Sequence, residues 1–123
     1  MKNNGSMILL ATAILVLLAQ SCVQKAYKKT VRYRLVTPTG KSIKVVSIRG
    51  SDKPLSWNAD LALRPIIADS VYEVDVTYVT GYNFTEVKFL VDGEFELKDQ
   101  SNRPVQFGAS DTTLYTATFN QLP

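Results

Sequence analysis

A stretch in the second half of the chain alternates strictly between apolar and polar side chains. Tyr or Val stands at every even position of Tyr72–Tyr78, and Glu73, Asp75 and Thr77 stand between them. Because successive side chains of an extended chain point to opposite faces, this period of two predicts a β-strand with one face in a core and the other in solvent. A strand of this kind is stable only within a larger sheet, so other segments must supply its neighbours.

Three further segments are rich in strand-forming residues. The alternation recurs in Val31–Leu35 and in Thr113–Phe119. Lys41–Arg49 has the same composition, but Val45 and Val46 break its alternation. A β-bulge at this pair, or burial of both faces of the strand, would explain the break.

The remaining strand signals are shorter. Leu61–Leu63 predicts a strand that ends before Pro65, because proline cannot donate to a ladder. Thr85–Val91 and Glu94–Lys98 are expected to form a hairpin, and Gln100–Gly108 has room for a short edge strand. Six or seven short strands without a convincing amphipathic helix predict an all-β domain over residues 30–123. We expect a small antiparallel β-sandwich, immunoglobulin-like in size.

The predicted hairpin at Asp92-Gly93 admits two registers. A two-residue loop would place Phe89 opposite Glu96, with a charge on the apolar face of the sheet. A three-residue loop that includes Val91 would instead pair Phe89 with Phe95 and keep opposite charges together on the outer face. We therefore predict the three-residue loop.

The N-terminal region carries a different signal. Met7–Ala19 is uncharged and almost entirely apolar, and it follows a short leader that contains Lys2. As a helix it would span only about 20 Å, less than the roughly 30 Å of bilayer hydrocarbon. A signal peptide over residues 1–21 is therefore favoured over a permanent transmembrane helix, and the protein is expected to be exported.

Cys22 is the only cysteine of the chain, so an internal disulfide is excluded. The segment Leu18-Ala19-Gln20-Ser21-Cys22 resembles the lipobox of bacterial lipoproteins, in particular of the Bacteroides type, although Ala19 stands where that family usually has a large aliphatic residue. The resemblance implies cleavage before Cys22 and acylation of this residue, with fatty acids such as palmitate. Several acyl chains anchor a protein far more firmly than one.

Charge is distributed unevenly over the mature chain. Residues 22–64 carry ten Lys or Arg against two acids, whereas residues 65–123 carry three against nine, and the overall balance of +2 does not argue for nucleic acid as a partner. Residues 22–29 form a short basic tether, and the basic residues near the anchor are Lys25, Lys28, Lys29, Arg32 and Arg34. They are candidates for contact with an anionic membrane surface; a solvated strand end is the equally weighted alternative.

Most catalytic chemistry lacks its residues here. The chain has no histidine, and its single thiol is assigned to the lipid, so Ser-His-Asp and Cys-His catalysis and the usual zinc sites are excluded. The carboxylates of Glu73, Asp75, Glu86, Glu94 and Glu96 are predicted on the outer faces of strands, where charge is ordinary. We expect no enzyme activity, no cofactor and no metal site.

Three aromatic residues in or near loops are the candidates for ligand or partner contact. They are Trp57, Tyr82 and Phe84. Exposed together, they would offer a platform for a sugar ring or a protein surface. The alternative is that they cap the ends of the sandwich core.

Two segments of the domain resemble the small MmpS-type β-sandwich proteins that accompany mycobacterial lipid-export pumps. The resemblance lies in Pro54-Leu55-Ser56-Trp57 and Phe89-Leu90-Val91-Asp92-Gly93, and it spans about Thr30 to Leu97. Members of that family have a transmembrane helix and a cysteine pair in the domain, and this chain has neither. The resemblance therefore supports the sandwich more than a transport partner.

These observations lead to one expectation of function and one alternative. We expect a membrane-anchored, non-enzymatic envelope lipoprotein that serves as a binding or adaptor module for another envelope protein. The alternative is a lipoprotein that binds carbohydrate or another surface ligand. Val23-Gln24-Lys25 lacks the aspartate and the acidic run that direct some lipoproteins elsewhere, so the lipobox resemblance implies the bacterial outer membrane, with the domain facing the periplasm.

Overall fold

The computed structural model describes residues 25–38 and 40–123, and this part of the chain is built from strands. They are β1 (Tyr27–Val36), β2 (Val46–Gly50), β3 (Leu61–Ala62), β4 (Arg64–Ile67), β5 (Val71–Thr80), β6 (Phe84–Val91), β7 (Glu94–Phe95), β8 (Arg103–Gln106) and β9 (Thr112–Thr118). Two of these nine strands, β3 and β7, have only two residues. Among the described residues no helix is long and apolar enough to cross a membrane. The predicted signal peptide and Cys22 lie outside the described residues.

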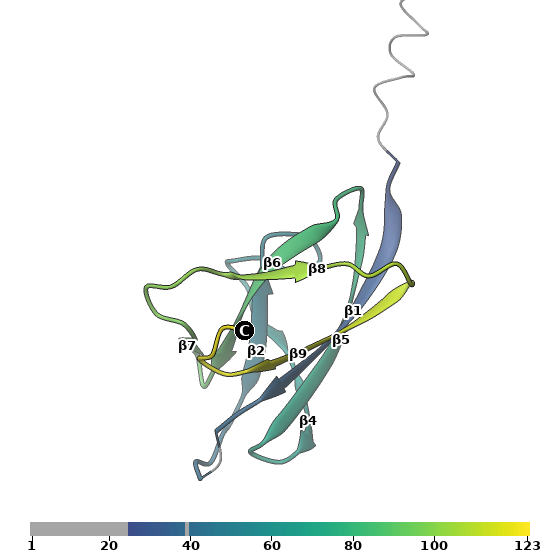
Figure 1. Ribbon diagram of the computed structural model, residues 1–123. Helices are drawn as coiled ribbons and strands as arrows, with labels where there is room; N and C mark the ends of the chain where they lie inside the picture. The colour runs from purple at the N-terminus through teal and green to yellow at the C-terminus, as the bar shows by residue number, and fades with distance from the viewer. Residues whose placement is uncertain (1–24, 39) are drawn as a thin grey trace, which may run out of the picture.

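The strands form two sheets that pack together as a sandwich (Figure 1). The first sheet has the order β4-β5-β1-β9, and the second has the order β3-β2-β6-β7, with β8 also pairing with β6. The prediction of a small all-β sandwich is therefore confirmed. The chain passes between the sheets several times, so each sheet combines segments that are far apart in sequence.

β1 lies at the centre of the first sheet. It pairs with β5 in antiparallel register from Tyr27↔Thr80 to Val36↔Val71. On its other side it pairs with β9, and this pairing is parallel. The antiparallel expectation holds for every other strand pair of the described chain. Parallel neighbours need a long crossover, and the whole second sheet lies between β1 and β9 in sequence.

The inner faces of both sheets form one hydrophobic core. Val31, Tyr33 and Leu35 of β1 are completely buried, as their alternation predicts. The Tyr33 ring meets Phe89 of the opposite sheet edge to face, with ring centroids 6.1 Å apart. Such aromatic pairs add about 0.5–1.5 kcal/mol beyond the area that they bury. β1 is thus fixed by its ladders and by contacts across the sandwich.

β2 is shorter than the strand predicted for Lys41–Arg49. It begins at Val46 because the two preceding amides, those of Lys44 and Val45, donate to Oδ1 of Asp92 over 2.8 and 2.9 Å rather than to a strand. Residues 46–48 are all buried, and their register with β6 runs without a bulge. Val45 precedes the strand and is 46% exposed, so neither a bulge nor burial of both faces explains the broken alternation; the strand simply begins at Val46.

Pro65 lies within a further short strand that the sequence pattern does not indicate. The strand at Leu61 does end before it, as β3, but the chain then crosses to the first sheet and continues as β4. β4 is the outermost strand of that sheet, and its register with β5 shifts between Pro65 and Ile67. An edge strand tolerates proline because one side of its backbone has no partner.

The predicted hairpin register is wrong. β6 and β7 pair Leu90 with Phe95 around a two-residue loop, and the Glu96 amide donates to the Phe89 carbonyl over 3.0 Å. Asp92 and Gly93 have φ angles of 48° and 82°. Positive φ at both positions is what a type I′ turn requires, and Asp-Gly favours this turn. Phe89 is therefore opposite Glu96.

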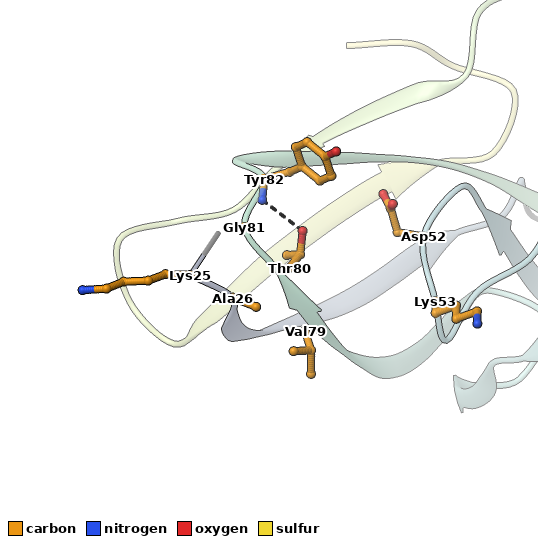
Figure 2. Close-up of a pocket in the computed structure, with 8 residues that line it drawn as sticks. All are labelled: Lys25, Ala26, Asp52, Lys53, Val79, Thr80, Gly81 and Tyr82. Carbon is orange, nitrogen blue, oxygen red and sulfur yellow. Dashed lines mark hydrogen bonds between the residues drawn. The ribbon is translucent and has the colours of Figure 1, made fainter. Parts of the chain in front are cut away.

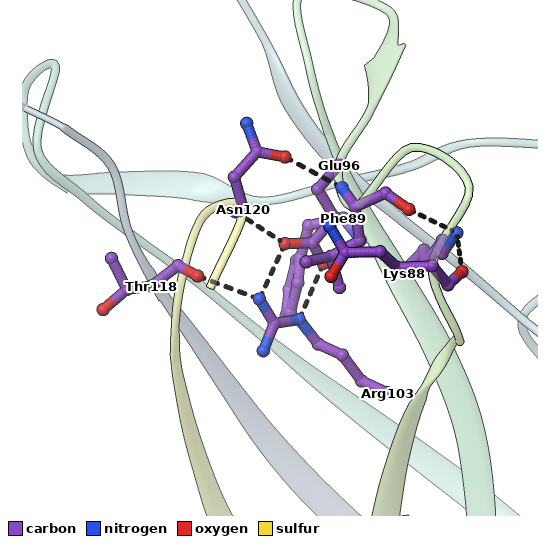
Figure 3. A network of polar contacts seen from close by, with 8 residues as sticks. Lys88, Phe89, Glu96, Arg103, Thr118 and Asn120 are labelled. Carbon is purple, nitrogen blue, oxygen red and sulfur yellow. Dashed lines mark hydrogen bonds and ion pairs between the residues drawn. The ribbon is translucent and has the colours of Figure 1, made fainter. Parts of the chain in front are cut away.

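The charge of Glu96, which argued against this register, is neutralised by Arg103 inside the protein. Glu96 is 0% exposed, and Arg103 at the start of β8 is 1% exposed. The Glu96 carboxylate accepts two bonds of 2.7 Å from the Arg103 guanidinium (Figure 3). It also accepts bonds from the backbone amides of Phe89 and Asn120, over 2.9 and 3.1 Å. Arg103 also donates to the Thr118 carbonyl over 2.8 Å. This network joins β6, β8 and the end of β9.

Candidate functional site

The three aromatic candidates do not form one platform. Tyr82 and Phe84, in and after the β5–β6 turn, are 67% and 52% exposed. Trp57 is half-buried and lines a groove on the second sheet. The alternative that these residues cap the core does not describe Tyr82 or Phe84 either, since more than half of each remains in solvent. Two separate surfaces therefore have to be considered.

The first surface is a cleft beside Tyr82, which we call the Tyr82 cleft (Figure 2). It has a volume of about 340 Å³ and is lined by Lys25, Ala26, Asp52, Lys53, Val79, Thr80, Gly81 and Tyr82. The turn that carries Tyr82 is held because its amide donates to Thr80 Oγ1 over 3.0 Å. Lys25 and Lys53 extend away from one another on either side of the cleft.

Asp52 is the acid of this cleft, and it is already engaged. Its Oδ2 accepts a bond of 2.6 Å from Thr85 Oγ1 and one of 3.2 Å from Ser51 Oγ. A carboxylate held in this way positions the loop between β2 and β3 against the first residues of β6. These bonds give Asp52 a structural role in holding the loop, rather than a role in acid–base chemistry.

A pair of tyrosines lies in the core near Asp52. The hydroxyls of Tyr33 and Tyr78 are 2.7 Å apart, and both residues are almost fully buried. The pKa of Tyr78 is raised to about 12, mainly by burial. The hydrogen bond with Tyr33 lowers this pKa, and the charge of Asp52 raises it. Burial also raises the pKa of Tyr33, followed by the influence of Tyr78. Both phenols therefore stay protonated at neutral pH.

The second surface is a groove of about 430 Å³ that we call the Trp57 groove. Its aromatic walls are Trp57 and Phe95, and polar groups of Lys88, Asp99 and Asn102 lie along it. Arg49 braces it, because Nη1 donates to the Trp57 carbonyl over 2.8 Å and the guanidinium lies 5.2 Å from the centre of the Phe95 ring. An aromatic wall beside amide and charged groups is the chemistry that stacks on and hydrogen-bonds a sugar ring.

A third hollow was not anticipated from the sequence. It has a volume of about 440 Å³, and we call it the Lys41 cleft; its lining includes Lys41, Ile43, Asp92, Glu94 and Asn120. These residues come from the loop after β1, the β6–β7 turn and the turn after β9. Only the fold brings three such distant segments together, so no local pattern in the sequence indicates this cleft.

The five basic residues predicted to face a membrane have different environments. Lys25 and Lys28 are exposed, whereas Lys29 donates to the Gly108 carbonyl over 3.3 Å. Arg32 pairs with Asp75 through two bonds of 2.8 and 3.0 Å, and Arg34 pairs with Glu73. The arginine charges are thus balanced within the sheet, and Lys25 and Lys28 extend into solvent.

Two of the predicted surface carboxylates are in fact buried. Glu96 lies in the network with Arg103, and Glu73 is only 7% exposed because it sits between Arg34 of β1 and Arg64 of β4 in the sheet. Within residues 25–38 and 40–123, no group of three or more acidic or thiol side chains is arranged to hold a metal ion. No protein-family model matches the chain, and no curated protein matches it either.

Proposed function

We propose that this protein is a membrane-anchored envelope lipoprotein whose sandwich acts without catalysis, as a binding or adaptor module for another envelope component. The observation that carries the proposal is the short path from Cys22 to the domain. β1 begins at Tyr27, five residues later, and it occupies the centre of a sheet. Five residues reach at most about 18 Å, so acylation of Cys22 would hold one end of the sandwich beside the membrane.

The engagement of the carboxylates supports a non-catalytic role. Ion pairs hold Glu73, Asp75, Asp60 and Glu96, each with an arginine. Asp92 accepts bonds from two backbone amides. Carboxylate oxygens that already accept bonds from arginine or from backbone amides are poorly placed to take a proton from a substrate.

The position of the Lys41 cleft supports an adaptor. β1 runs from Tyr27 to Val36, and the loop that follows it contributes to this cleft. Nine residue steps of a strand cover about 30 Å, so the cleft lies at the end of the sandwich opposite to the start of β1. A domain anchored at one end would present this cleft to partners in the periplasm. We assign the anchor to the outer membrane on the residues after Cys22.

Labelling and protease accessibility test the anchor and the location. We expect a fatty acid such as labelled palmitate to be incorporated into the wild-type protein, and Cys22→Ala to leave the membrane fraction. Protease added to intact cells should leave the domain uncut. A Cys22→Ala variant that stays membrane-bound without label would contradict the anchor, and cleavage in intact cells would place the domain on the surface.

Site-specific photo-crosslinking in native membranes tests the adaptor. A crosslinker at Lys41 should give one dominant protein product, and one at Arg64, on the exposed face of β4, should not. A product of equal yield from both positions would indicate non-specific proximity and would contradict a dedicated surface at the Lys41 cleft.

The Trp57 groove favours one second candidate, the binding of carbohydrate. A glycan array probed with the purified protein tests it, and Trp57→Ala should abolish any binding that uses this groove. Tyr82→Ala is the matched control, because Tyr82 lines a different surface. Binding that survives Trp57→Ala but is lost with Tyr82→Ala would move the ligand to the Tyr82 cleft, and specific binding of either kind would favour this function over the adaptor.

A further inference from the structure

Four large apolar side chains are exposed at the end of the sandwich where the described chain begins. They are Tyr27, Val79, Tyr82 and Phe84, and each is more than half exposed, from 52% to 67%. Tyr27 is paired with Thr80, and Val79 with Lys28, so these side chains come from neighbouring positions of β1, β5 and the turn into β6. Figure 1 shows the start of β1 and the β5–β6 turn at the same end of the molecule. We call this surface the N-terminal end.

Lysines surround this apolar surface. Lys25 and Lys53 line the Tyr82 cleft on either side, and Lys28 is exposed beside Val79. Lys29 lies at the same end, bonded to Gly108. The acids at this end are Asp52, which accepts bonds from Thr85 and Ser51, and Asp111 next to the start of β9. The end therefore has an excess of positive charge around exposed tyrosine, phenylalanine and valine.

From this surface we propose that the N-terminal end rests directly on the lipid headgroups, with Tyr82 and Phe84 in the interface and Lys25, Lys28 and Lys53 against anionic lipid. Tyrosine prefers the boundary between water and hydrocarbon because its ring is apolar and its hydroxyl is polar. Lysine near an anionic surface is attracted to it. The chemistry that fits this end is a phospholipid surface.

The direction of the chain identifies the occupant. Residues 1–24 precede Lys25 at this end, and five residues separate Cys22 from Tyr27. The inference rests on the proposed acylation of Cys22, because that anchor confines the N-terminal end to within about 18 Å of its lipid. It goes beyond the anchor, because it gives the domain a second contact and a fixed orientation. Arg32 and Arg34, which are paired with acids, are not part of it.

The test uses the mature lipidated protein, purified from membranes and reconstituted into phospholipid vesicles. Since Cys22 is the only cysteine, a cysteine introduced elsewhere is the only free thiol once Cys22 is acylated. Asn83→Cys places an environment-sensitive fluorophore between Tyr82 and Phe84. Ala68→Cys places it in the exposed turn at the other end of β5, about 30 Å away along the strand.

We expect the fluorophore at Asn83 to shift its emission to the blue and to be quenched by nitroxide-labelled lipids, and the fluorophore at Ala68 to show neither effect. The double change Tyr82→Ser and Phe84→Ser should remove most of the quenching at Asn83. Ile66→Ser with Ile67→Ser, which are exposed on β4, is the matched control and should leave it unchanged. Anionic lipid in the vesicles should increase the quenching at Asn83. The double change Lys25→Gln with Lys53→Gln should remove this increase.

Equal quenching at Asn83 and Ala68 would overturn the proposal. Shielding at Asn83 that occurs in native membranes but not in lipid vesicles would assign the end to a protein partner, and shielding that grows with protein concentration in lipid-free detergent would assign it to a second copy; either overturns it. Failure of the anchor has its own signature. If Cys22 is not acylated, the wild-type protein itself takes up the fluorophore.

Discussion

The protein contains two Arg–carboxylate pairs of similar geometry in very different surroundings. Arg103 and Glu96 are joined by bonds of 2.7 Å, and their side chains are 1% and 0% exposed. Arg32 and Asp75 are joined by bonds of 2.8 and 3.0 Å, but their side chains are 46% and 45% exposed. Both pairs are bidentate, but the buried pair also has bonds to the backbone of Phe89, Asn120 and Thr118.

The contrast shows that the same bond serves two purposes. On the outer face of the first sheet, water competes for both partners, and Arg32–Asp75 mainly favours the β1–β5 register. Inside the second sheet, losing either partner of Arg103–Glu96 would leave the other as an unpaired buried charge. Such a charge strongly destabilises the folded state. Burial lowers the pKa of Arg103, but the hydrogen bond and charge of Glu96 outweigh it and raise the pKa overall. Arg103 therefore stays charged inside the sheet.

The largest effect is expected when the buried pair is broken. Arg103→Met leaves Glu96 without its guanidinium, and we expect the free energy of unfolding to fall by about 3–5 kcal/mol. Urea denaturation measures this. Arg32→Met is the matched control and should change the unfolding midpoint little. Replacing both buried partners, as Glu96→Leu with Arg103→Met, should restore part of the lost stability, because no unpaired charge remains. A double variant less stable than Arg103→Met would contradict this explanation.

A smaller effect is expected at the buried tyrosine pair, which is neutral. Tyr78→Phe leaves the Tyr33 hydroxyl without its partner and should cost about 1–3 kcal/mol. Tyr82→Phe, on an exposed ring, should cost almost nothing. If Tyr33→Phe and Tyr78→Phe are additive in the double variant, the hydroxyl bond has no role in stability.

The same pair predicts a loss of stability at alkaline pH. The pKa of Tyr78 is raised to about 12 in the folded protein, mainly by burial, whereas an unfolded tyrosine has a pKa of about 10. The unfolded chain therefore loses its proton first, and stability should fall as pH rises from about 10 to about 12. Tyr78→Phe should flatten this decline. Spectrophotometric titration should find a tyrosine that ionises only well above the ordinary tyrosine pKa of about 10.

The smallest effect is expected at the exposed pair. The hydrogen bond from Arg32 lowers the pKa of Asp75; burial opposes this, and the charges of Arg32 and Arg64 add to the lowering. Because the folded pKa is lowered, the contribution is present above the unfolded value of about 3.9 and is lost as pH falls through the folded pKa. Asp75→Asn should shift the urea midpoint less than Tyr78→Phe does, and less again in high salt. A midpoint difference that persists in strong acid would contradict this account.

Local patterns were enough to predict the strands that have one regular buried face. β1 and β5 follow their alternation, and the all-β sandwich follows from the number and spacing of such segments. The predicted hairpin register is wrong because the neighbouring sequence gives no sign of a partner for the Glu96 charge. Its partner Arg103 lies at the start of β8, after the loop that follows β7. Asn120, near the C-terminal end of the sequence, completes the network.

The surfaces were less predictable than the strands. Of the three aromatic candidates, Tyr82 and Phe84 are exposed, but the fold separates them from Trp57. The Lys41 cleft needs three distant segments, so no spacing in the sequence could indicate it. The five basic residues form one cluster in the sequence, but in the fold Arg32 and Arg34 pair with acids of β5, whereas Lys25 and Lys28 remain exposed.

The central position of β1 has a mechanical consequence. The proposed anchor at Cys22 would transmit any force on the domain into the N-terminal end of this strand, along its axis. β1 is held by ten residue pairs on one side and seven on the other. Because the strand-to-strand hydrogen bonds run across the strand direction, such a pull loads these ladders in shear, with many bonds sharing the force, instead of opening them one after another. With ten and seven paired residues, the strand that would follow the proposed anchor is well placed to resist being drawn out of the domain.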